Sequence, residues 1–293
     1  MAQASGFRDL LKRNGMVVAP GAYDCITAKL IEQAGFAAVY MTGAGTAATL
    51  GYPDFGLVTM SEMVANAGRI AAAVDLPVIA DADTGYGNEL NVFRTVREFE
   101  RSGVTGIHIE DQEFPKKCGH LEGKQVIPRE DYLAKIRAAI AARRDKDFAI
   151  IARTDSRAVA GFDEAIARAN GSLAAGADMA FVEAPQTLEE VAAVPRLVKG
   201  PCLLNVVRGG KTPEVDLRRA EAMGYRLAIV PGLLLKAVIG ACDEMLAQLK
   251  ATHVHPAPRS DMTVRDAFNR VGADEWDALR TRFRDAEARR AAE

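Results

Sequence analysis

The sequence contains few cysteines for its length. The chain has 293 residues and 4 cysteines, at positions 25, 118, 202 and 242. A small secreted scaffold held by disulfides needs a far denser set, and cysteines at this frequency are typical of reduced thiols in a cytoplasmic protein. Cys202 and Cys242 lie among apolar neighbours, which predicts that both belong to the core.

Uninterrupted apolar runs of membrane-spanning length are absent as well. The most apolar late stretch, LAIVPGLLLKAVIGAC, is broken by Pro231, Gly232 and Lys236 and is too short to cross a bilayer. The N-terminal stretch MAQASGFRDLLKRNG contains no apolar segment of the kind found in signal peptides. We therefore expect a cytoplasmic protein without a membrane partner.

No charge of one sign dominates. Lys and Arg number 37, Asp and Glu number 39, and the net charge is -2. This balance gives no electrostatic reason to expect nucleic acid or an anionic membrane as the partner. Apolar residues make up 49% of the chain, which suffices for one large α/β domain or two small ones.

Short apolar runs alternate with longer amphipathic segments along most of the chain. Each run is almost continuously apolar, as a strand buried on both faces should be. The expected strands cover residues 16–20, 37–42, 76–83, 106–111, 148–154, 179–184, 201–207 and 226–231. The clearest expected helices cover residues 61–74, 89–103, 129–144 and 163–176. Eight such units over about 250 residues predict an α/β protein with a (β/α)8 TIM barrel, whereas an open doubly wound sheet rarely needs eight evenly spaced units.

The last part of the chain exceeds what eight units need. We assign residues 1–250 to the catalytic barrel and residues 251–293 to a C-terminal linker and helical extension. The extension opens with prolines and ends in charged helical sequence, which favours a role in oligomer packing.

Polar residues cluster where the expected strands end. The carboxyl ends of the strands form one rim of a barrel, and barrel enzymes build their active sites on that rim from several strands. These side chains are therefore the candidate site. A turn to polar sequence at strand ends explains one or two of them, but poorly explains the whole set. The set comprises Thr42, Asp81, Asp83, Glu110, Asp111, Arg153, Asp155, Glu183 and Asn205.

Asp81 and Asp83 lie in the stretch ADADTGYG, one residue apart. Residues i and i+2 of a strand point to the same face, and two carboxylates aimed together repel unless a cation lies between them. Oxygen ligands of this kind suit Mg²⁺ or Mn²⁺, and Glu110 at the end of the next strand could complete the set. The alternative is a helix cap or a structural salt bridge.

The stretch GAGTAA after the second expected strand imitates a dinucleotide-binding fingerprint. Gly51 and Pro53 interrupt the helix that should follow, and the acid expected about 20 residues further on is missing. We interpret the stretch as a loop whose backbone N–H groups and Thr42 hydroxyl hold an anionic group. Arg153 could clamp a carboxylate or form an ion pair with Asp81 or Glu183.

Cys118 lies in the stretch EFPKKCGHLEGK. A disulfide does not suit the expected compartment, and a zinc site needs more soft ligands than Cys118 and His120. Lys116, Lys117 and His120 favour the thiolate and predict a lowered thiol pKa, which suits a proton donor or acceptor. Flanking glycines and a proline predict a loop that opens and closes over the barrel mouth. The remaining alternative is an exposed loop with a chance cysteine.

Together the stretches KKCGH (116–120), DADTGYG (81–87), GIHIEDQ (106–112) and TGAG (42–45) resemble the isocitrate lyase/phosphoenolpyruvate mutase superfamily. The resemblance runs from about residue 6 to 250. KKCGH is typical of the carbon–carbon lyase branch, and FPKKCGHLEGKQVI is most similar to 2,3-dimethylmalate and 2-methylisocitrate lyases. It implies a barrel whose last helix is exchanged between subunits, in a homotetramer.

The resemblance also implies roles for individual residues. Mg²⁺, with Mn²⁺ as a substitute, would be held near Asp81, Asp83 and Glu110, mostly through water. Cys118 would be the acid/base, helped by Lys116 and His120, with Glu110 and Tyr40 as further catalytic candidates. The carboxylate substrate would be bound by Thr42, Gly43, Ala44, Asp54, Gly119, Arg153, Glu183 and Asn205.

This sequence departs from the resemblance at a few positions. Thr42 replaces a usual Ser and keeps the hydroxyl, whereas Arg208 stands where relatives usually have Glu. Leu233 and Lys236 stand where methylisocitrate lyases tend to have Ser or Thr and Arg. These departures bear on the substrate and leave the chemistry as expected.

The resulting hypothesis is a Mg²⁺-dependent retro-aldol cleavage of a 2-hydroxy di- or tricarboxylate to pyruvate, or another 2-oxo acid, and a carboxylic acid. Cys118 would protonate the carbanion left by the departing acid. The alternatives are phosphonate mutase chemistry, hydrolysis or decarboxylation of oxaloacetate, and a carboxylate-binding barrel that has lost turnover.

Overall fold

The computed structural model describes residues 6–12, 15–258, 260 and 262–292. The chain divides into two compact units, residues 1–237 and 238–293. The expectation that no signal peptide is present rests partly on residues 1–5 and 13–14, which lie outside the described residues. Among the described helices, none is both long and apolar enough to span a bilayer.

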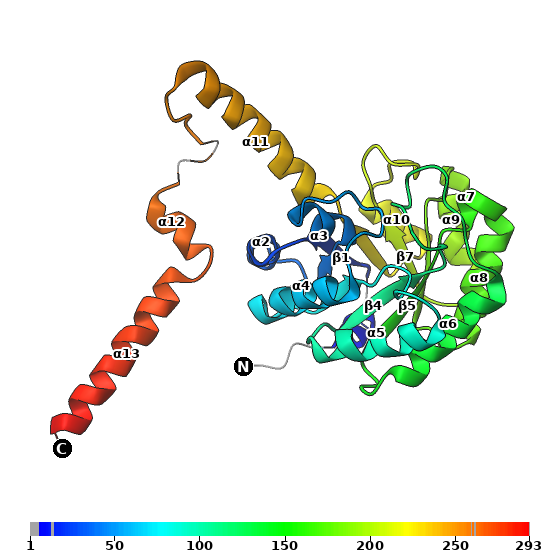
Figure 1. Ribbon diagram of the computed structural model, residues 1–293, viewed down its shortest axis with the longest axis horizontal. Coiled ribbons are helices and arrows are strands. Elements are labelled where there is room, and N and C mark those ends of the chain that lie inside the picture. The colour runs from blue at the N-terminus through cyan, green and yellow to red at the C-terminus, as the bar shows by residue number, and fades with distance from the viewer. Residues whose placement is uncertain (1–5, 13–14, 259, 261, 293) are drawn as a thin grey trace. The chain divides into compact units, whose positions relative to one another are not determined.

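The first unit is a closed barrel of eight parallel strands in sequence order, with helices around it (Figure 1). The ring closes where β1 pairs with β8, with Val17 opposite Leu227. The predicted TIM barrel is therefore confirmed, and each strand lies within its predicted range or a residue or two beyond it. The strands are β1 Val17–Ala22, β2 Val39–Met41, β3 Val78–Asp81, β4 Gly106–Glu110, β5 Ala149–Thr154, β6 Met179–Val182, β7 Cys202–Asn205 and β8 Leu227–Val230.

The barrel helices begin and end at local sequence signals. Helix α4 follows Thr59, which forms a reciprocal capping box with Glu62, and α5 follows Asn88, which caps it in the same way. Gly103 and Gly176 adopt positive φ just after α5 and α8, as predicted for helix stops. The helices of this unit are α1 Phe7–Lys12, α2 Cys25–Gln33, α3 Gly43–Thr49, α4 Met60–Ala73, α5 Glu89–Arg101, α6 Arg129–Ala142, α7 Arg157–Ala160, α8 Phe162–Ala174, α9 Leu188–Leu197 and α10 Leu217–Met223.

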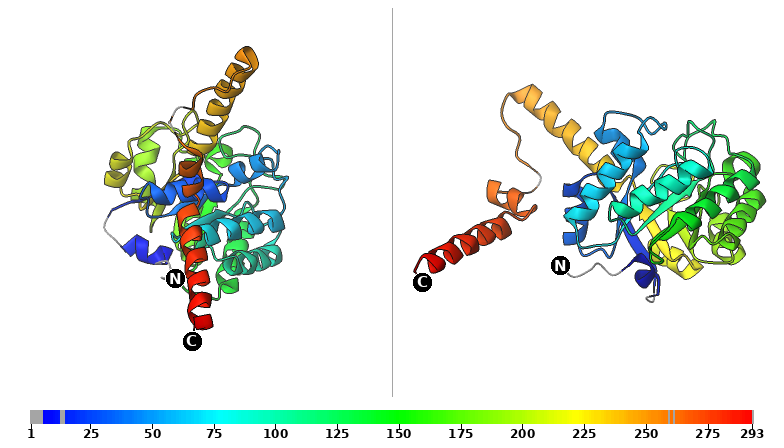
Figure 2. Two further views of the ribbon diagram at one scale, coloured as in Figure 1. Left: turned by 90° about the vertical axis from the view of Figure 1, so that its left-hand side faces the viewer. Right: turned by 60° about the horizontal axis from the view of Figure 1, so that its bottom comes forward.

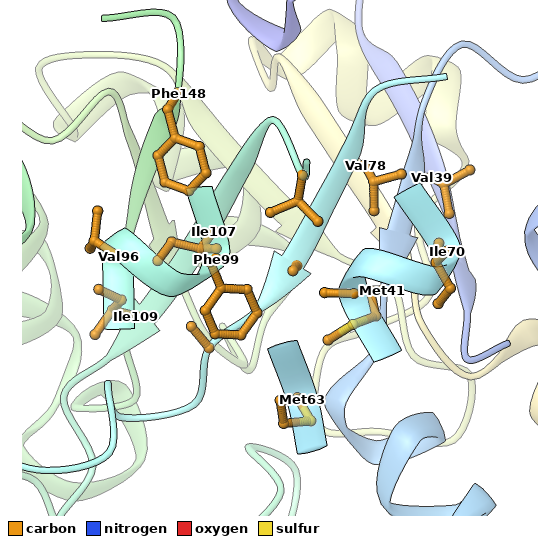
Figure 3. Packing of buried hydrophobic residues seen from close by; sticks show 14 of the residues in the cluster. Val39, Met41, Met63, Ile70, Val78, Val96, Phe99, Ile107, Ile109 and Phe148 are labelled. Carbon is orange, nitrogen blue, oxygen red and sulfur yellow. The ribbon is translucent and has the colours of Figure 1, made fainter. Parts of the chain in front are cut away.

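Successive strand residues belong to different apolar clusters. Val78 and Ala80 pack in a cluster with Phe99 of α5, whereas Ile79 between them packs in a second cluster with Phe181. This follows from the two-residue period of a strand, which points neighbouring side chains to opposite faces. Figure 3 shows the first cluster, where helix side chains lie against the strands. The apolar layers on both sides hold the strand ends in fixed positions.

The stretch GAGTAA is not the loop that the sequence predicts. Residues Gly43–Thr49 form the short helix α3, and the Thr42 hydroxyl accepts a hydrogen bond from the Gly45 N–H at 3.3 Å as its N-cap. Gly51 and Pro53 end the helix early, so the dinucleotide fingerprint still lacks its long helix.

The remaining helices are α11 Leu233–Thr252, α12 Val264–Asn269 and α13 Ala273–Ala292. Helix α11 begins in the first unit and continues into the second. The second unit is coloured orange to red in Figure 2. Cys242 lies on α11 and is exposed, so the prediction that it belongs to the core is wrong, whereas Cys202 is buried as expected. Large apolar side chains are exposed along α11, among them Ile239 and Leu246.

Candidate active site

A cavity of about 230 Å³ opens at the carboxyl ends of the strands. Its walls combine most of the residues that the sequence predicts with the β7–α10 segment and the start of α11. The predicted residues that line it are Tyr40, Thr42, Ala44, Asp54, Asp81, Cys118, Gly119, His120, Arg153, Glu183 and Asn205. The other predicted residues, Gly43, Asp83, Glu110 and Lys116, contact these walls without lining the cavity.

Asp81 and Asp83 lie together, but not for the predicted reason. Strand β3 ends at Asp81, and Asp83 has left the strand with a left-handed φ of 47°. The Asp83 N–H donates to Asp81 Oδ1 at 2.9 Å, and the backbone folds back to bring the second carboxylate beside the first. A non-glycine residue in this conformation is strained, which is common where a site needs a particular orientation.

Lys116 supplies a cation to this pair of carboxylates. Its ammonium lies 2.7 Å from Asp83 Oδ1 and 2.6 Å from Asp54 Oδ1, and the side chain is buried. Burial raises the pKa of Asp83, and the neighbouring carboxylates of Asp81 and Asp54 raise it further, so that it reaches about 6 despite the opposing charge of Lys116. The pKa of Asp81 is held well below its usual value, against its burial, by His108, Lys116 and Arg153.

His108 is a site residue that the sequence reasoning missed. It lies on β4, fully buried, with Nε2 2.8 Å from the Tyr40 hydroxyl and 3.5 Å from Asp81 Oδ1. Burial lowers the pKa of His108 to about 4, so the ring is neutral at neutral pH. Its position in the alternating stretch GIHIED, where an apolar residue would fit a buried strand, is the signal that could have identified it.

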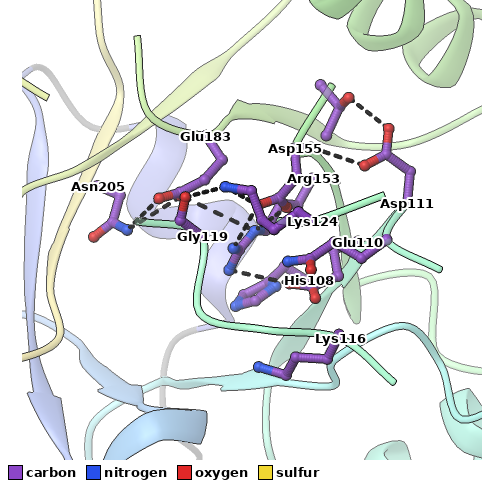
Figure 4. A network of polar contacts seen from close by, with 12 residues as sticks. His108, Glu110, Asp111, Lys116, Gly119, Lys124, Arg153, Asp155, Glu183 and Asn205 are labelled. Carbon is purple, nitrogen blue, oxygen red and sulfur yellow. Dashed lines mark hydrogen bonds and ion pairs between the residues drawn. The ribbon is translucent and has the colours of Figure 1, made fainter. Parts of the chain in front are cut away.

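Arg153 lies between several acids on the floor of the cavity (Figure 4). Its guanidinium donates to both Asp155 oxygens at 2.9 and 3.1 Å and lies 3.2 Å from Glu110 Oε2 and 3.9 Å from Glu183 Oε2. The sequence analysis allowed an ion pair of Arg153 with Asp81 or with Glu183. Among the described residues, the pair with Glu183 is present and the pair with Asp81 is not. Asp155 belongs to the predicted set at the strand ends, and its backbone N–H donates to Asp111 Oδ1 at 2.8 Å.

Glu183 and Asn205 form the next part of the wall. Glu183 receives hydrogen bonds from Asn205 Nδ2 at 3.2 and 3.3 Å, and its Oε1 lies 3.0 Å from His120 Nε2. Although burial raises it, the pKa of Glu183 falls to about 2 because Arg153 and His120 lie beside it. His120 accepts from the Lys211 N–H through Nδ1 at 3.0 Å, which leaves the Nε2 proton for Glu183.

The segment that carries Cys118 lies directly on these residues. A Cβ on Gly119 would come within 2.5 Å of Arg153 Nη2 and 2.6 Å of Glu183 Cγ, so only glycine permits this approach. The Cys118 N–H donates to the Asp54 carbonyl at 3.2 Å. Lys124, which had no predicted role, is buried, donates to the Gly119 carbonyl and lies 3.6 Å from Asp155 Oδ1. These contacts fasten the loop over the floor of the cavity (Figure 4).

The prediction that neighbouring cations lower the Cys118 pKa is wrong. Burial raises the pKa of this thiol above its usual value, and the nearby carboxylates of Asp54 and Glu183 act in the same direction. The charge of Lys116 is directed to Asp54 and Asp83. Cys118 is therefore a neutral thiol at neutral pH, which can donate a proton.

Of the four departures noted in the sequence, Thr42 lines the cavity, and the other three differ in their distance from it. Arg208 is 91% exposed, lies 3.5 Å from Glu214 and does not line the cavity. Leu233 is also exposed and does not line it. Lys236 does line the cavity, and its Nζ donates to the Arg208 carbonyl at 2.7 Å.

The expected magnesium fits the donors at the inner wall. Both oxygens of Glu110 are buried without a hydrogen bond, and oxygen is the ligand that Mg²⁺ prefers. Burial raises the pKa of Glu110 well above its usual value, as expected for a buried acid with too little compensating charge. Among the described residues, no three acids, histidines or cysteines lie close enough to hold an ion directly. The carboxylates of Asp81, Asp83 and Glu110 therefore suit an ion that keeps several of its water ligands.

Comparison with known proteins matches nearly the whole chain to one family. The family model described as phosphoenolpyruvate phosphomutase matches residues 7–250. A 2,3-dimethylmalate lyase of Eubacterium barkeri is 45% identical over 92% of this chain and 93% of its own. A 2-methylisocitrate lyase of Aeropyrum pernix is 42% identical over 98% of this chain and 91% of its own.

Solved structures of similar proteins have the same fold as this chain. Oxaloacetate acetylhydrolase in complex with the inhibitor 3,3-difluorooxalacetate superposes with a TM-score of 0.90 at 38% identity, over 95% of this chain and 96% of that one. Phosphonopyruvate hydrolase in complex with oxalate and Mg²⁺ superposes with a TM-score of 0.84 at 30% identity, over 97% and 99% of the two chains. The same fold thus serves several reactions in these proteins.

Proposed function

Because the chain belongs to the phosphoenolpyruvate mutase/isocitrate lyase superfamily, we propose that it is a Mg²⁺-dependent carbon–carbon lyase. Its substrate is a 2-hydroxy di- or tricarboxylate of the 2,3-dimethylmalate or 2-methylisocitrate type. Its products are pyruvate, or another 2-oxo acid, and a carboxylic acid. The observation that carries the proposal is Cys118, a neutral thiol that lines the same cavity as the buried, positively charged Arg153.

The floor of the cavity supports the binding of a carboxylate. Burial disfavours a charged Arg153, yet the acids around it raise its pKa well above the usual value, so it stays positive. Asn205 supports this wall through the hydrogen bonds that its Nδ2 donates to Glu183, and Gly119 leaves the loop backbone close to the guanidinium. Arg153 holds the carboxylate of the fragment that departs as the free acid.

The inner wall binds the other end of the substrate. Bound near Asp81, Asp83 and Glu110, Mg²⁺ (or Mn²⁺) would supply positive charge for the 2-hydroxyl oxygen and the adjacent carboxylate. The hydroxyl proton passes to this acidic wall, where Asp83 has a pKa of about 6 and so a substantial affinity for a proton. Tyr40, hydrogen-bonded to Asp81 at 3.3 Å, helps to orient the wall.

Cys118 completes the reaction as the acid. When the bond between the two carbons breaks, its electron pair remains on the carbon beside the departing carboxylate. The thiol proton of Cys118 is transferred to that carbon, and the thiolate then recovers a proton from solvent when the loop opens. Because the pKa of Cys118 is raised, the thiol is protonated at neutral pH and ready for this step.

The test is an assay of 2-oxo acid release with 2-methylisocitrate, 2,3-dimethylmalate, isocitrate and oxaloacetate, with Mg²⁺ and with EDTA. Wild type should release pyruvate from one of the first two and lose this activity in EDTA. Cys118→Ser should lower kcat by about 10²- to 10⁴-fold, the usual contribution of a general acid. Cys25→Ser, on α2 outside the cavity, is the matched control. Turnover by Cys118→Ser within a few-fold of wild type would refute the role of Cys118, and no product from any substrate would refute the lyase.

Oxaloacetate hydrolysis is a second candidate, favoured by the similarity to oxaloacetate acetylhydrolase. Release of acetate and oxalate from oxaloacetate in the same assay identifies it. Phosphonate mutase chemistry, suggested by the description of the family model, and a barrel without turnover are the further alternatives. Turnover of phosphonopyruvate would identify the mutase chemistry. Binding of a carboxylate in a ligand titration without turnover of any substrate would identify the inactive barrel.

We also propose that the protein is a cytoplasmic homotetramer in which the C-terminal helices are exchanged between subunits. The exposed apolar residues of α11, among them Ile239, Leu246 and Leu249, support a covered helix in the assembly. The four unpaired cysteines suit a reducing compartment. Light scattering on the full chain tests the tetramer, and a monomeric mass would refute it.

A further inference from the structure

The loop that carries Cys118 is closed at its base by backbone pairing. The Glu113 N–H donates to the Gln125 carbonyl at 2.9 Å, and Gln112 forms an isolated antiparallel bridge with Val126. Pairing at the base fixes the two ends of the loop. The position of Cys118, further along it, depends on other contacts.

Gln112 provides one of these contacts through its side chain. Its carboxamide extends to the backbone of Lys117, where Oε1 accepts from the N–H at 3.0 Å and Nε2 donates to the carbonyl at 2.8 Å. Gln112 is only 1% exposed. A carboxamide offers a donor and an acceptor side by side, as the two backbone groups of one residue require. Gln112 therefore holds Lys117 through both of its backbone polar groups.

The carbonyl groups on both sides of Cys118 are held by buried side chains. The Lys117 carbonyl before it accepts from Gln112 Nε2, and the Gly119 carbonyl after it accepts from the ammonium of Lys124 (Figure 4). The Cys118 N–H donates to the Asp54 carbonyl at 3.2 Å. These contacts oppose rotation of the backbone, which would move the thiol out of the cavity.

Gln112 differs from the other residues that hold the loop in being uncharged. Lys124 lies 3.6 Å from Asp155 Oδ1, and Lys116 pairs with Asp54 and Asp83, so replacing either lysine also changes the electrostatics of the site. A neutral replacement of Gln112 releases the loop and leaves every charge of the site in place. It therefore isolates the effect of the position of the loop.

We propose that Gln112 is a positioning residue, whose carboxamide holds the Lys117 backbone so that the Cys118 thiol faces the substrate carbon that it protonates. This inference rests on the proposed function, because it assigns Gln112 to the step in which Cys118 donates its proton. Without the two hydrogen bonds the loop opens more often, and the thiol is less often within reach of that carbon. The variant should therefore lose kcat while KM changes little.

The test uses a Cys25→Ser/Cys242→Ser background, which leaves Cys118 and the buried Cys202 as the thiols. Gln112→Met removes both hydrogen bonds with a side chain of similar size. Gln112→Asn keeps the amide in the buried position but is one methylene shorter. The matched control is Gln125→Met, the same change at an exposed residue of the same loop. For each variant, kcat and KM are measured for 2-oxo acid release, and alkylation of Cys118 by iodoacetamide without substrate is followed by mass spectrometry.

Gln112→Met should lower kcat by about 10-fold or more, with KM within threefold of wild type, and Cys118 should be alkylated about 10-fold faster, as expected for the loss of two neutral hydrogen bonds. Gln112→Asn should change both values in the same direction, and Gln125→Met should change neither. If Gln112 stabilised only the fold, urea unfolding would shift while Cys118 of the folded variants reacted at the wild-type rate. That result, or a kcat within threefold of wild type in both Gln112 variants, would overturn the proposal.

The alkylation rate requires no turnover, so it separates this inference from the proposed function. If wild type cleaves no substrate but alkylation of Cys118 is 10-fold faster in Gln112→Met, the positioning of Cys118 by Gln112 stands and the proposed lyase fails. If wild type cleaves a substrate and neither kcat nor alkylation depends on Gln112, the lyase stands and this inference fails.

Discussion

The middle of the barrel strands and their carboxyl ends are equally buried but chemically opposite. Ile79 and Phe181 lie in the middle, and Asp81 and Glu183 lie two residues further along the same chain segments. In the middle, burial of apolar surface stabilises the fold without demanding particular partners. At the ends, every buried charge must be compensated by another side chain, because desolvation opposes it.

This difference indicates which part of the barrel serves stability and which serves chemistry. A hydrophobic replacement of a buried ion pair is often neutral or stabilising, so the rim is not the most stable solution for these strands. The strained Asp83 and the buried oxygens of Glu110, which accept no hydrogen bond, support the same interpretation. The apolar layers in the middle of the strands hold the rim in place and take no part in its chemistry.

The largest effect is expected when one partner of the rim is removed. Arg153→Met leaves Asp155, Glu110 and Glu183 buried without their main cation, and breaking a buried pair costs about 3–5 kcal/mol. Urea unfolding should report this loss, and pyruvate release should fall below detection. Arg129→Met, which removes the exposed partner of Glu164, is the control and should change neither value. Wild-type stability of Arg153→Met would show that the rim is not electrostatically coupled.

A substitution in the middle layer should affect stability alone. Phe99→Ala removes a fully buried ring between α5 and the strands and should lower the free energy of unfolding by about 3–5 kcal/mol. Activity per folded molecule, measured where the variant is fully folded, should stay within threefold of wild type. A large loss of kcat in the folded variant would contradict the division between layers and rim.

A smaller effect is expected from pH at His108. Its pKa of about 4 lies below the ordinary 6.5, so folding favours the neutral ring. The stabilisation is therefore present above pH 6.5 and is lost as pH falls toward 4. The difference in unfolding free energy between wild type and His108→Gln should shrink by about 2 kcal/mol between pH 7 and pH 5. A difference that is constant over this range would refute the assignment.

The smallest effect is expected at the loop over the cavity. Gly119→Ala places a Cβ against Arg153 and Glu183, so the loop cannot lie where it does and activity should fall at least about 10-fold, or 1.4 kcal/mol in the barrier. The unfolding free energy should change by less than about 1 kcal/mol, because the loop adds little to the apolar layers. Gly123→Ala, in the same loop, adds strain at a positive φ but meets only Lys117 Nζ at 3.4 Å, so it is the control for a general disturbance of the loop. Equal losses in both variants would assign the effect to loop strain.

Much of the fold could be predicted because its signals are local. Buried strands read as short apolar runs, and helices begin and end at capping residues such as Thr59 and Asn88. The candidate site at the strand ends could also be predicted, since acids and an arginine directly after apolar runs are unusual. The errors concern features that depend on what surrounds a residue, as with the exposed Cys242 and the short helix α3.

The barrel, the candidate rim and the loop that carries Cys118 could all be predicted from the sequence, because periodicity and residue type act over a few neighbouring positions. Which charges meet depends on the folded chain. In the folded chain Lys116 pairs with Asp54 and Asp83, burial raises the pKa of Cys118, and His108 and Lys124, to which the sequence assigned no role, join the site. Desolvation and ion pairing depend on contacts between residues far apart in the chain, and spacing along the sequence carries no record of them.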